Sequence, residues 1–260
     1  MRPKLGMSYA NRSVAYYATT ERNRSGNDNG VNGEVTHLSN FTTASWMSPW
    51  KLFGGNVVAG ATLPIQNSAQ NPRTLDAGND GIKIGDVYLQ PLTLYWPLQR
   101  GFMSLGYGLW LPTGSFDAAD ANSIGKGFLS HEISFGWTHS PFENEDWHYS
   151  VLTRYSFHGS VDGLQLTPGD EVVLDWSLGK HVGERWNFGA LGYGVFQTSR
   201  DSGSDANRDL GYYGVGALGF EGRYAMPDWG GYASFRIFQE FQAYNHTEGQ
   251  LAILSLSFLL

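Results

Sequence analysis

The chain has 260 residues, of which 41% are hydrophobic, 15% aromatic and only 16% charged, with a formal net charge of −7. Mean hydropathy is −0.30 and no apolar run reaches about 18 residues, which excludes a helical membrane protein. The acidic balance without basic runs argues against nucleic acid as a partner, and the absence of cysteine excludes disulfides and thiol chemistry.

In chain order, twelve segments with alternating or strand-like patterns are expected to form β-strands. Most reach the roughly 9–11 residues that a tilted strand needs to cross the hydrocarbon layer. If every second residue faces lipid and the others face water, the modest mean hydropathy is explained. The segments are residues 5–20, 34–46, 52–63, 85–96, 101–111, 128–138, 147–158, 170–182, 186–198, 210–224, 231–245 and 250–260.

The connections between these segments alternate between long and short. Short ones are expected at 48–50, 97–100, 141–146, 183–184 and 227–230; long ones are expected at 21–33, 64–84, 112–127, 159–169 and 199–209, with a shorter one at 246–249. This parity predicts an all-β fold: a transmembrane antiparallel up-and-down β-barrel of about 12 strands, one domain over residues 1–260, with both termini on the periplasmic side. The alternative is a soluble all-β sandwich, which has no reason to keep such parity.

Several strands set an apolar face against a face that carries charges. In 170–182, for example, Leu174 and Trp176 oppose Glu171 and Asp175. A charge facing the middle of the bilayer costs about 2–4 kcal/mol, so charged faces should point into the lumen. Such charges either set the selectivity of a pore or pair and close a narrow barrel; the sequence leaves both open. The predicted lumen residues are Glu132, Arg154, Glu171, Asp175, Glu221, Arg223, Arg236 and Glu240.

Tryptophan, proline and glycine positions add three expectations. Seven tryptophans lie at or next to short turns and predict an aromatic girdle at the periplasmic interface. Pro91 interrupts a strand and is a candidate for a break in the ladder and a lateral exit into lipid. Gly106 and Gly108 should face the lumen and make room for a solute. The girdle residues are Trp46, Trp50, Trp96, Trp137, Trp147, Trp186 and Trp229.

Catalytic and metal-binding patterns are weak. No nucleophile elbow, zinc-protease motif or phosphate loop occurs, and we expect no catalytic residue, metal or cofactor. His131, on an outward face, is the candidate that would suit an enzyme acting on outer-membrane lipid. The loop from Asp117 to Ser123 offers oxygen ligands for a cation such as Ca²⁺, but its pattern favours a hydrogen-bonded turn over a metal site. Charges between Arg200 and Asp209 suit a solvated loop that contacts lipopolysaccharide.

Four stretches together resemble the outer-membrane channel family named for the meta-pathway of phenol degradation. They run from Trp46 to Pro64 (WMSPWKLFGGNVVAGATLP), from Gly85 to Trp96 (GDVYLQPLTLYW), from Leu111 to Thr138, and from Pro168 to Asp201. The resemblance implies a monomeric outer-membrane barrel of about twelve strands that takes up small hydrophobic molecules such as aromatic growth substrates. No signal peptide is visible, and an outer-membrane protein needs one, so we expect this sequence to be a mature or a re-engineered form.

The leading functional expectation is passive uptake of small hydrophobic or aromatic molecules through the barrel. Outer-membrane lipid and lipopolysaccharide are the expected surroundings. The alternatives are a lipid-modifying enzyme, which depends on His131, and a closed structural barrel, in which the lumen charges are locked in pairs.

Overall fold

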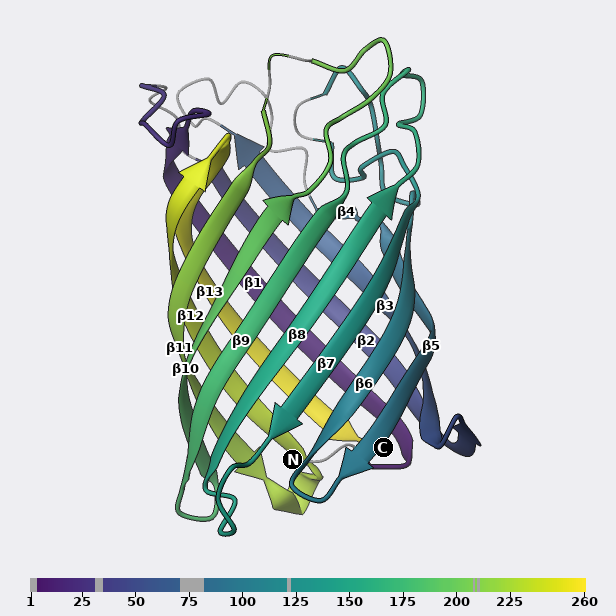
Figure 1. The fold of residues 1–260 in the computed structure, drawn as a ribbon, viewed down its shortest axis with the longest axis vertical. Helices are drawn as coiled ribbons and strands as arrows, with labels where there is room; N and C mark the ends of the chain where they lie inside the picture. Colours follow the sequence, from purple (N-terminus) through teal and green to yellow (C-terminus); the bar gives the residue numbers. More distant parts are fainter. Residues whose placement is uncertain (1–3, 31–34, 71–81, 121–122, 208, 210) are drawn as a thin grey trace.

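The chain folds into a closed antiparallel β-barrel, as the sequence predicts. The structure, a computed structural model, describes residues 4–30, 35–70, 82–120, 123–207, 209 and 211–260. In this part of the chain, neighbouring strands pair in sequence order, and β1–β13 and β2–β3 pairings complete a ring of twelve long strands (Figure 1). The strands are β1 (Gly6–Arg22), β2 (Val35–Leu52), β3 (Gly55–Gln70), β4 (Lys83–Ile84), β5 (Val87–Leu98), β6 (Gly101–Leu111), β7 (Ser130–His139), β8 (Trp147–His158), β9 (Glu171–Val182), β10 (Trp186–Gln197), β11 (Gly214–Met226), β12 (Gly231–Tyr244) and β13 (His246–Leu259).

Two small elements lie outside the ring of long strands. The two-residue β4 directly precedes β5 in the chain and pairs with β3 through Ile84 and Ile65. A short 3₁₀ helix, Pro227–Trp229, fills the turn between β11 and β12. Among the described residues, no helix is long and apolar enough to cross a membrane.

Both chain ends lie at the end of the barrel that carries the short turns, and the longer connections gather at the other end (Figure 1). This arrangement follows from the even number of long strands, because each up-and-down pair returns the chain to the same rim. We call the end with the termini the periplasmic rim and the opposite end the extracellular rim. The apolar outer wall and the fold place the barrel in the outer membrane.

Alternation along each strand separates the two faces of the wall. On β9, Leu174, Trp176 and Leu178 are exposed on the outside, while Asp175 reaches Arg154 of β8 on the inside. Side chains from strands that are not neighbours, such as Tyr16 of β1 and Glu240 of β12, also touch. Such contacts can form only on the concave face, so they identify the lumen side.

The predicted turn at residues 48–50 is wrong. β2 continues to Leu52, and the reversal lies at Phe53 and Gly54, whose φ angles are 49° and 79°. The register shifts between Met47 and Lys51, because Pro49 has no N–H for the ladder. Side-chain bonds replace it: the Trp50 N–H donates to Ser48 Oγ at 3.1 Å.

The predicted connection at residues 246–249 is also wrong. β12 ends at Tyr244 and β13 begins at His246, so Asn245 alone, with a φ of 45°, joins them. β3 likewise runs to Gln70, beyond its predicted end at residue 63. In both cases the strands continue above the apolar band, where polar residues hide the alternation that marks a strand.

Candidate functional site in the barrel lumen

The eight charged residues predicted for the lumen lie on inward faces and form three groups of contacts. Arg154 Nη2 and Asp175 Oδ2 are 2.6 Å apart, between β8 and β9. Glu221 accepts hydrogen bonds from Arg223 Nη2, at 3.0 Å, and from Arg236 Nε. The other three acids, Glu132, Glu171 and Glu240, have tyrosine partners.

Glu240 is the most connected of these acids. Its Oε1 accepts the Tyr193 hydroxyl at 2.6 Å, and its Oε2 accepts the Tyr16 hydroxyl at 2.9 Å and the Gly249 N–H at 2.8 Å. The residue is 4% exposed. A buried carboxylate needs several donors to offset its lost hydration, and β1, β10 and β13 supply them here.

The extracellular half of the boundary between β12 and β13 is held by side chains rather than by a regular ladder. The paired register ends at Gln239 opposite Gln250. Beyond it, Glu240 binds the Gly249 N–H and Glu248 Oε2 accepts the Ala243 N–H at 3.2 Å. We call this segment the carboxylate seam.

Tyrosines also screen the acids on the other walls. The Tyr88 hydroxyl of β5 donates to Glu132 Oε1 of β7 at 2.8 Å, across the intervening β6. Gly108 makes room for that ring, because a Cβ there would lie 2.2 Å from the Tyr88 hydroxyl oxygen. The space that we expected this glycine to leave for a solute is therefore filled by Tyr88. At the extracellular rim, Tyr213 donates to Glu171.

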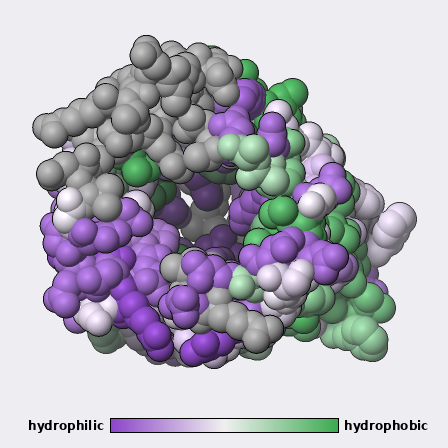
Figure 2. Space-filling model, turned by 90° about the horizontal axis from the view of Figure 1, so that it is seen from above, coloured by the Kyte–Doolittle hydropathy of each residue, from purple (hydrophilic) through white to green (hydrophobic). Residues whose placement is uncertain are grey.

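An apolar cluster lines part of the inner wall. Leu191, Ala217 and Phe238 are buried together, from β10, β11 and β12. Three partly buried side chains pack against them: Tyr193, Leu251 and Ile253. The lumen therefore carries both charged and apolar surface. Seen from the extracellular rim, the described side chains leave a central hollow with hydrophilic residues around it (Figure 2).

Two histidines meet inside the barrel near the periplasmic rim, which the sequence pattern did not reveal. The rings of His148 on β8 and His181 on β9 have centroids 5.2 Å apart. Asn187 of β10 is 4% exposed, and its side-chain oxygen and nitrogen have no hydrogen-bond partner. No group of three or more histidine or carboxylate side chains suited to a metal ion occurs within the described ranges.

The predicted girdle tryptophans lie near the short turns, as their sequence positions require. Trp46 and Trp50 contact edge to face at 5.5 Å, and Trp137 contacts Tyr149 in the same way at 5.2 Å. Trp96 Nε1 donates to the Phe53 carbonyl oxygen at 3.0 Å. The other three girdle residues, Trp147, Trp186 and Trp229, are exposed.

His131 lies on the outer face, as expected, but without a catalytic partner. Its Nδ1 is 2.6 Å from the Tyr107 hydroxyl, and its ring stacks on Phe157 at 4.9 Å. No hydrogen bond joins it to a serine among the residues that the structure describes. In the loop after β6, Asp117 Oδ1 accepts the Ala119 N–H at 2.9 Å, which is a hydrogen-bonded turn; residues 121–122 of that loop lie outside the described residues.

Pro91 lies at an irregularity in β5. The register with β3 shifts between Val58 and Gly60, and that with β6 shifts between Leu89 and Leu92. Pro91 itself pairs with neither neighbour, because its ring nitrogen has no hydrogen to donate. The ladder is thus interrupted there, as the proline predicts, and resumes on both sides.

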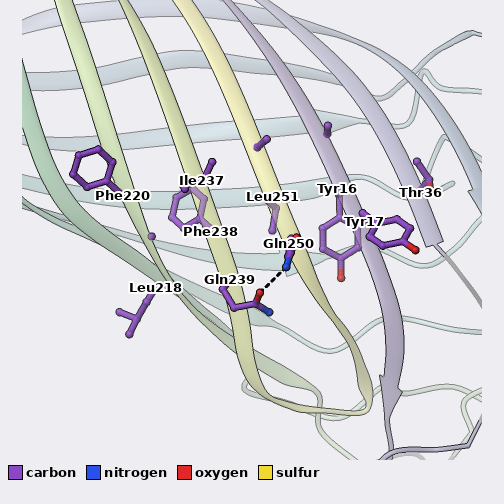
Figure 3. Close-up of a pocket in the computed structure, with 13 residues that line it drawn as sticks. Tyr16, Tyr17, Thr36, Leu218, Phe220, Ile237, Phe238, Gln239, Gln250 and Leu251 are labelled. Atoms are coloured by element: carbon purple, nitrogen blue, oxygen red, sulfur yellow. Dashed lines mark hydrogen bonds between the residues drawn. The ribbon is translucent and has the colours of Figure 1, made fainter.

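The outer wall has two polar features at lipid-facing positions. Asn11 of β1 and Asn40 of β2 bond reciprocally, with Nδ2–Oδ1 distances of 2.8 and 2.9 Å. Elsewhere a groove of about 590 Å³ crosses β11, β12, β13 and β1. Gln239 and Gln250 lie side by side in it, joined at 2.9 Å (Figure 3). This groove borders the carboxylate seam.

Arg12 is a further lumen residue that the sequence reasoning missed. It follows Ser8 and Ala10 on the inward face of β1, whose residue Tyr16 reaches Glu240. β1 has small and polar residues on both faces, so alternation alone does not show which face points into the lumen. A charge in mid-strand was nevertheless the available signal, because its cost in lipid would have placed Arg12 inside.

Comparison with known proteins places the fold among outer-membrane barrels. The family described as "Putative MetA-pathway of phenol degradation" matches residues 19–256. The COG4313 outer membrane channel from Pseudomonas putida F1 superposes with a TM-score of 0.87 at 10% identity, over 100% of this chain and 97% of that chain. The beta domain of the Bordetella autotransporter Brka gives a TM-score of 0.55 at 13% identity, over 99% and 100%. No curated protein sequence matches the chain.

Proposed function

The chain belongs to the MetA-pathway family of phenol degradation, and from this premise we propose that it is an outer-membrane channel for small hydrophobic or aromatic molecules. The observation that carries the proposal is the central hollow, whose inner wall combines charged side chains with the apolar cluster of Leu191, Ala217 and Phe238. A wall of this kind gives an amphipathic solute favourable contacts along its path. The similar fold of a protein described as an outer membrane channel supports the same assignment.

The lumen charges have a selectivity role in this proposal. Opposed charges on the wall of a narrow pore favour one sign of ion and orient polar ends of solutes. Arg154 with Asp175, and Glu221 with Arg223 and Arg236, are the groups concerned. Solute leaves at the periplasmic end or through the wall; for the second route, Pro91 stays the predicted lateral exit.

A closed structural barrel is the second candidate, favoured by the same ion pairs. If the pairs serve only to hold the wall, Arg236→Gln should lower thermal stability and leave permeability unchanged. In a working channel, the variant should also shift the ion selectivity. The lipid-enzyme alternative has weaker support, because Tyr107 and Phe157 are the partners of His131.

The deciding experiment uses the purified full-length chain in a planar lipid bilayer. We expect stable single-channel conductance, together with flux of a small aromatic acid into proteoliposomes. Protein-free bilayers and liposomes, and liposomes holding an unrelated closed barrel, provide the baselines. Absence of both conductance and flux from correctly folded protein would overturn the proposal.

The surroundings of the barrel remain predictions of the same proposal. We expect a monomer whose outer wall contacts lipid, with the tryptophans at the short turns in the interface. The extracellular loops are expected to contact lipopolysaccharide; in them the Arg200 guanidinium lies over the Tyr212 ring at 5.7 Å. Lipid-stripped protein run on a sizing column should elute at the mass of one chain plus detergent.

A further inference from the structure

Arg12 places an unpaired positive charge inside the barrel. Its side chain is exposed and points to the lumen, and no hydrogen bond or ion pair joins it to another described residue. The other lumen arginines, Arg154, Arg223 and Arg236, each have a carboxylate partner. An arginine without a partner costs little in a wet lumen, and its guanidinium remains available to an incoming group.

Three guanidinium groups converge from different walls. β1, which carries Arg12, and β8, which carries Arg154, are on opposite sides of the ring, because five strands separate them in either direction: β13, β12, β11, β10 and β9, or β2, β3, β5, β6 and β7. Arg12 is nevertheless within electrostatic range of Arg154 and of Arg236 on β12, and also of Asp175 on β9. The three side chains must therefore reach toward the middle of the lumen.

The inward arginines differ in how far carboxylates neutralise them. Arg154 is paired with Asp175, whereas Arg223 and Arg236 share Glu221, so that this second group carries one positive charge in excess. Three further inward acids, Glu132, Glu171 and Glu240, accept tyrosine hydroxyls. Of the four arginines Arg12, Arg154, Arg223 and Arg236, Arg12 is thus the one without a carboxylate partner among the described residues.

Apolar surface begins directly beside the arginines. Arg236 is paired with Ile253 of β13, which packs against the apolar cluster. Phe238 of that cluster follows Arg236 by two residues on the same inward face. Two residues of a strand span about 7 Å, which is comparable with the length of one aromatic ring. A ligand could therefore place an anionic end at the arginines and an apolar body against Phe238.

We propose that Arg12, Arg154 and Arg236 form a binding site for the carboxylate of a small hydrophobic acid, whose apolar part lies against Phe238, Leu251 and Ile253. The guanidinium fork matches a carboxylate in two parallel hydrogen bonds. This site deepens the proposed channel function, on which it rests, by naming an anionic aromatic or aliphatic acid as the solute class. A neutral aromatic molecule would leave Arg12 without a counterion and is expected to bind less well.

The test measures binding and ion selectivity separately, on the full chain. Calorimetric titration in detergent at pH 7.5 would compare sodium benzoate, neutral benzamide and sodium acetate. We expect benzoate to bind about tenfold more tightly than benzamide, which lacks the charge that a guanidinium group recognises, and than acetate, which lacks the apolar ring that would lie against Phe238. Arg12→Gln should lose about tenfold in benzoate affinity, Arg12→Lys should retain part of it, and Arg185→Gln, in an exposed periplasmic turn, should change it less than twofold.

Bilayer recordings under a KCl gradient provide the second readout. Wild-type protein should give a reversal potential of an anion-preferring pore, and Arg12→Gln should move it toward the cation side. Equal binding of benzoate and benzamide, or equal benzoate affinity in wild type and Arg12→Gln, would overturn the proposed site. If the protein still conducts, the channel proposal would be unaffected by that result. Tight benzoate binding without conductance or flux would support the site and overturn the channel. Circular dichroism would verify that each variant is folded.

Discussion

Replacing Glu240 tests whether the carboxylate holds the extracellular half of the barrel together. Its three bonds join Tyr16, Tyr193 and the Gly249 N–H. In Glu240→Ala the two hydroxyls can bond to lumen water, at a net cost of about 0.5–1.5 kcal/mol each, while the buried N–H loses its partner at about 1–3 kcal/mol. We therefore expect a loss of about 3 kcal/mol in the free energy of unfolding.

Glu240→Gln separates the hydrogen bonds from the charge. The amide oxygen can still accept the Gly249 N–H, so we expect a loss of only about 1 kcal/mol. Urea titration in lipid vesicles, followed by tryptophan fluorescence, would measure both variants, with Glu184→Ala in an exposed turn as control. If Glu240→Ala unfolded at the wild-type midpoint, or if the glutamine variant lost as much as the alanine variant, the reasoning would be refuted.

Three further changes probe the wall. Leu254→Arg puts a charge at a lipid-facing position that is 60% exposed, so the free energy of unfolding should fall by about 2–4 kcal/mol. Ser257→Arg, on the inward face, should lower it much less. Urea titration midpoints in lipid vesicles would compare the two variants. Gly101→Ala places a Cβ 1.9 Å from the Thr138 carbonyl oxygen at a φ of 154°, so the folded fraction on cold gel electrophoresis should fall. Tyr88→Phe removes the donor to buried Glu132, which should lower unfolding free energy by about 1.5–3 kcal/mol in the same titration.

The sequence predicted the barrel well where one physical constraint acted on each residue. On β7, β8 and β9, lipid admits only apolar residues on one face, so Glu132, Arg154 and Asp175 could be assigned to the other face from alternation alone. The ends of β2 and β12 were misjudged because, beyond the apolar band, neither face is constrained by lipid. Pro49 also read as a turn signal, although a β-bulge accommodates it equally well.

The partners of the lumen residues could not be predicted from the pattern. Alternation gives the face of a residue but not the angle around the ring or the height at which it lies. The bond from Tyr16 to Glu240 joins residues 224 positions apart, and it exists because β1 closes on β13. The convergence of Arg12 and Arg154 likewise depends on the diameter and shear of the closed barrel, which only the structure supplies.

The reciprocal bonds between Asn11 and Asn40 bear on how the chain enters the membrane. A lone amide at a lipid-facing position would leave its donors and acceptor unsatisfied in hydrocarbon, at a cost of several kcal/mol. The two amides satisfy each other only when β1 and β2 are paired in the observed register. A slip by one residue would turn one amide inward and strand the other in lipid. In the membrane, the Asn11–Asn40 pair therefore favours the observed register of β1 and β2 over its neighbours.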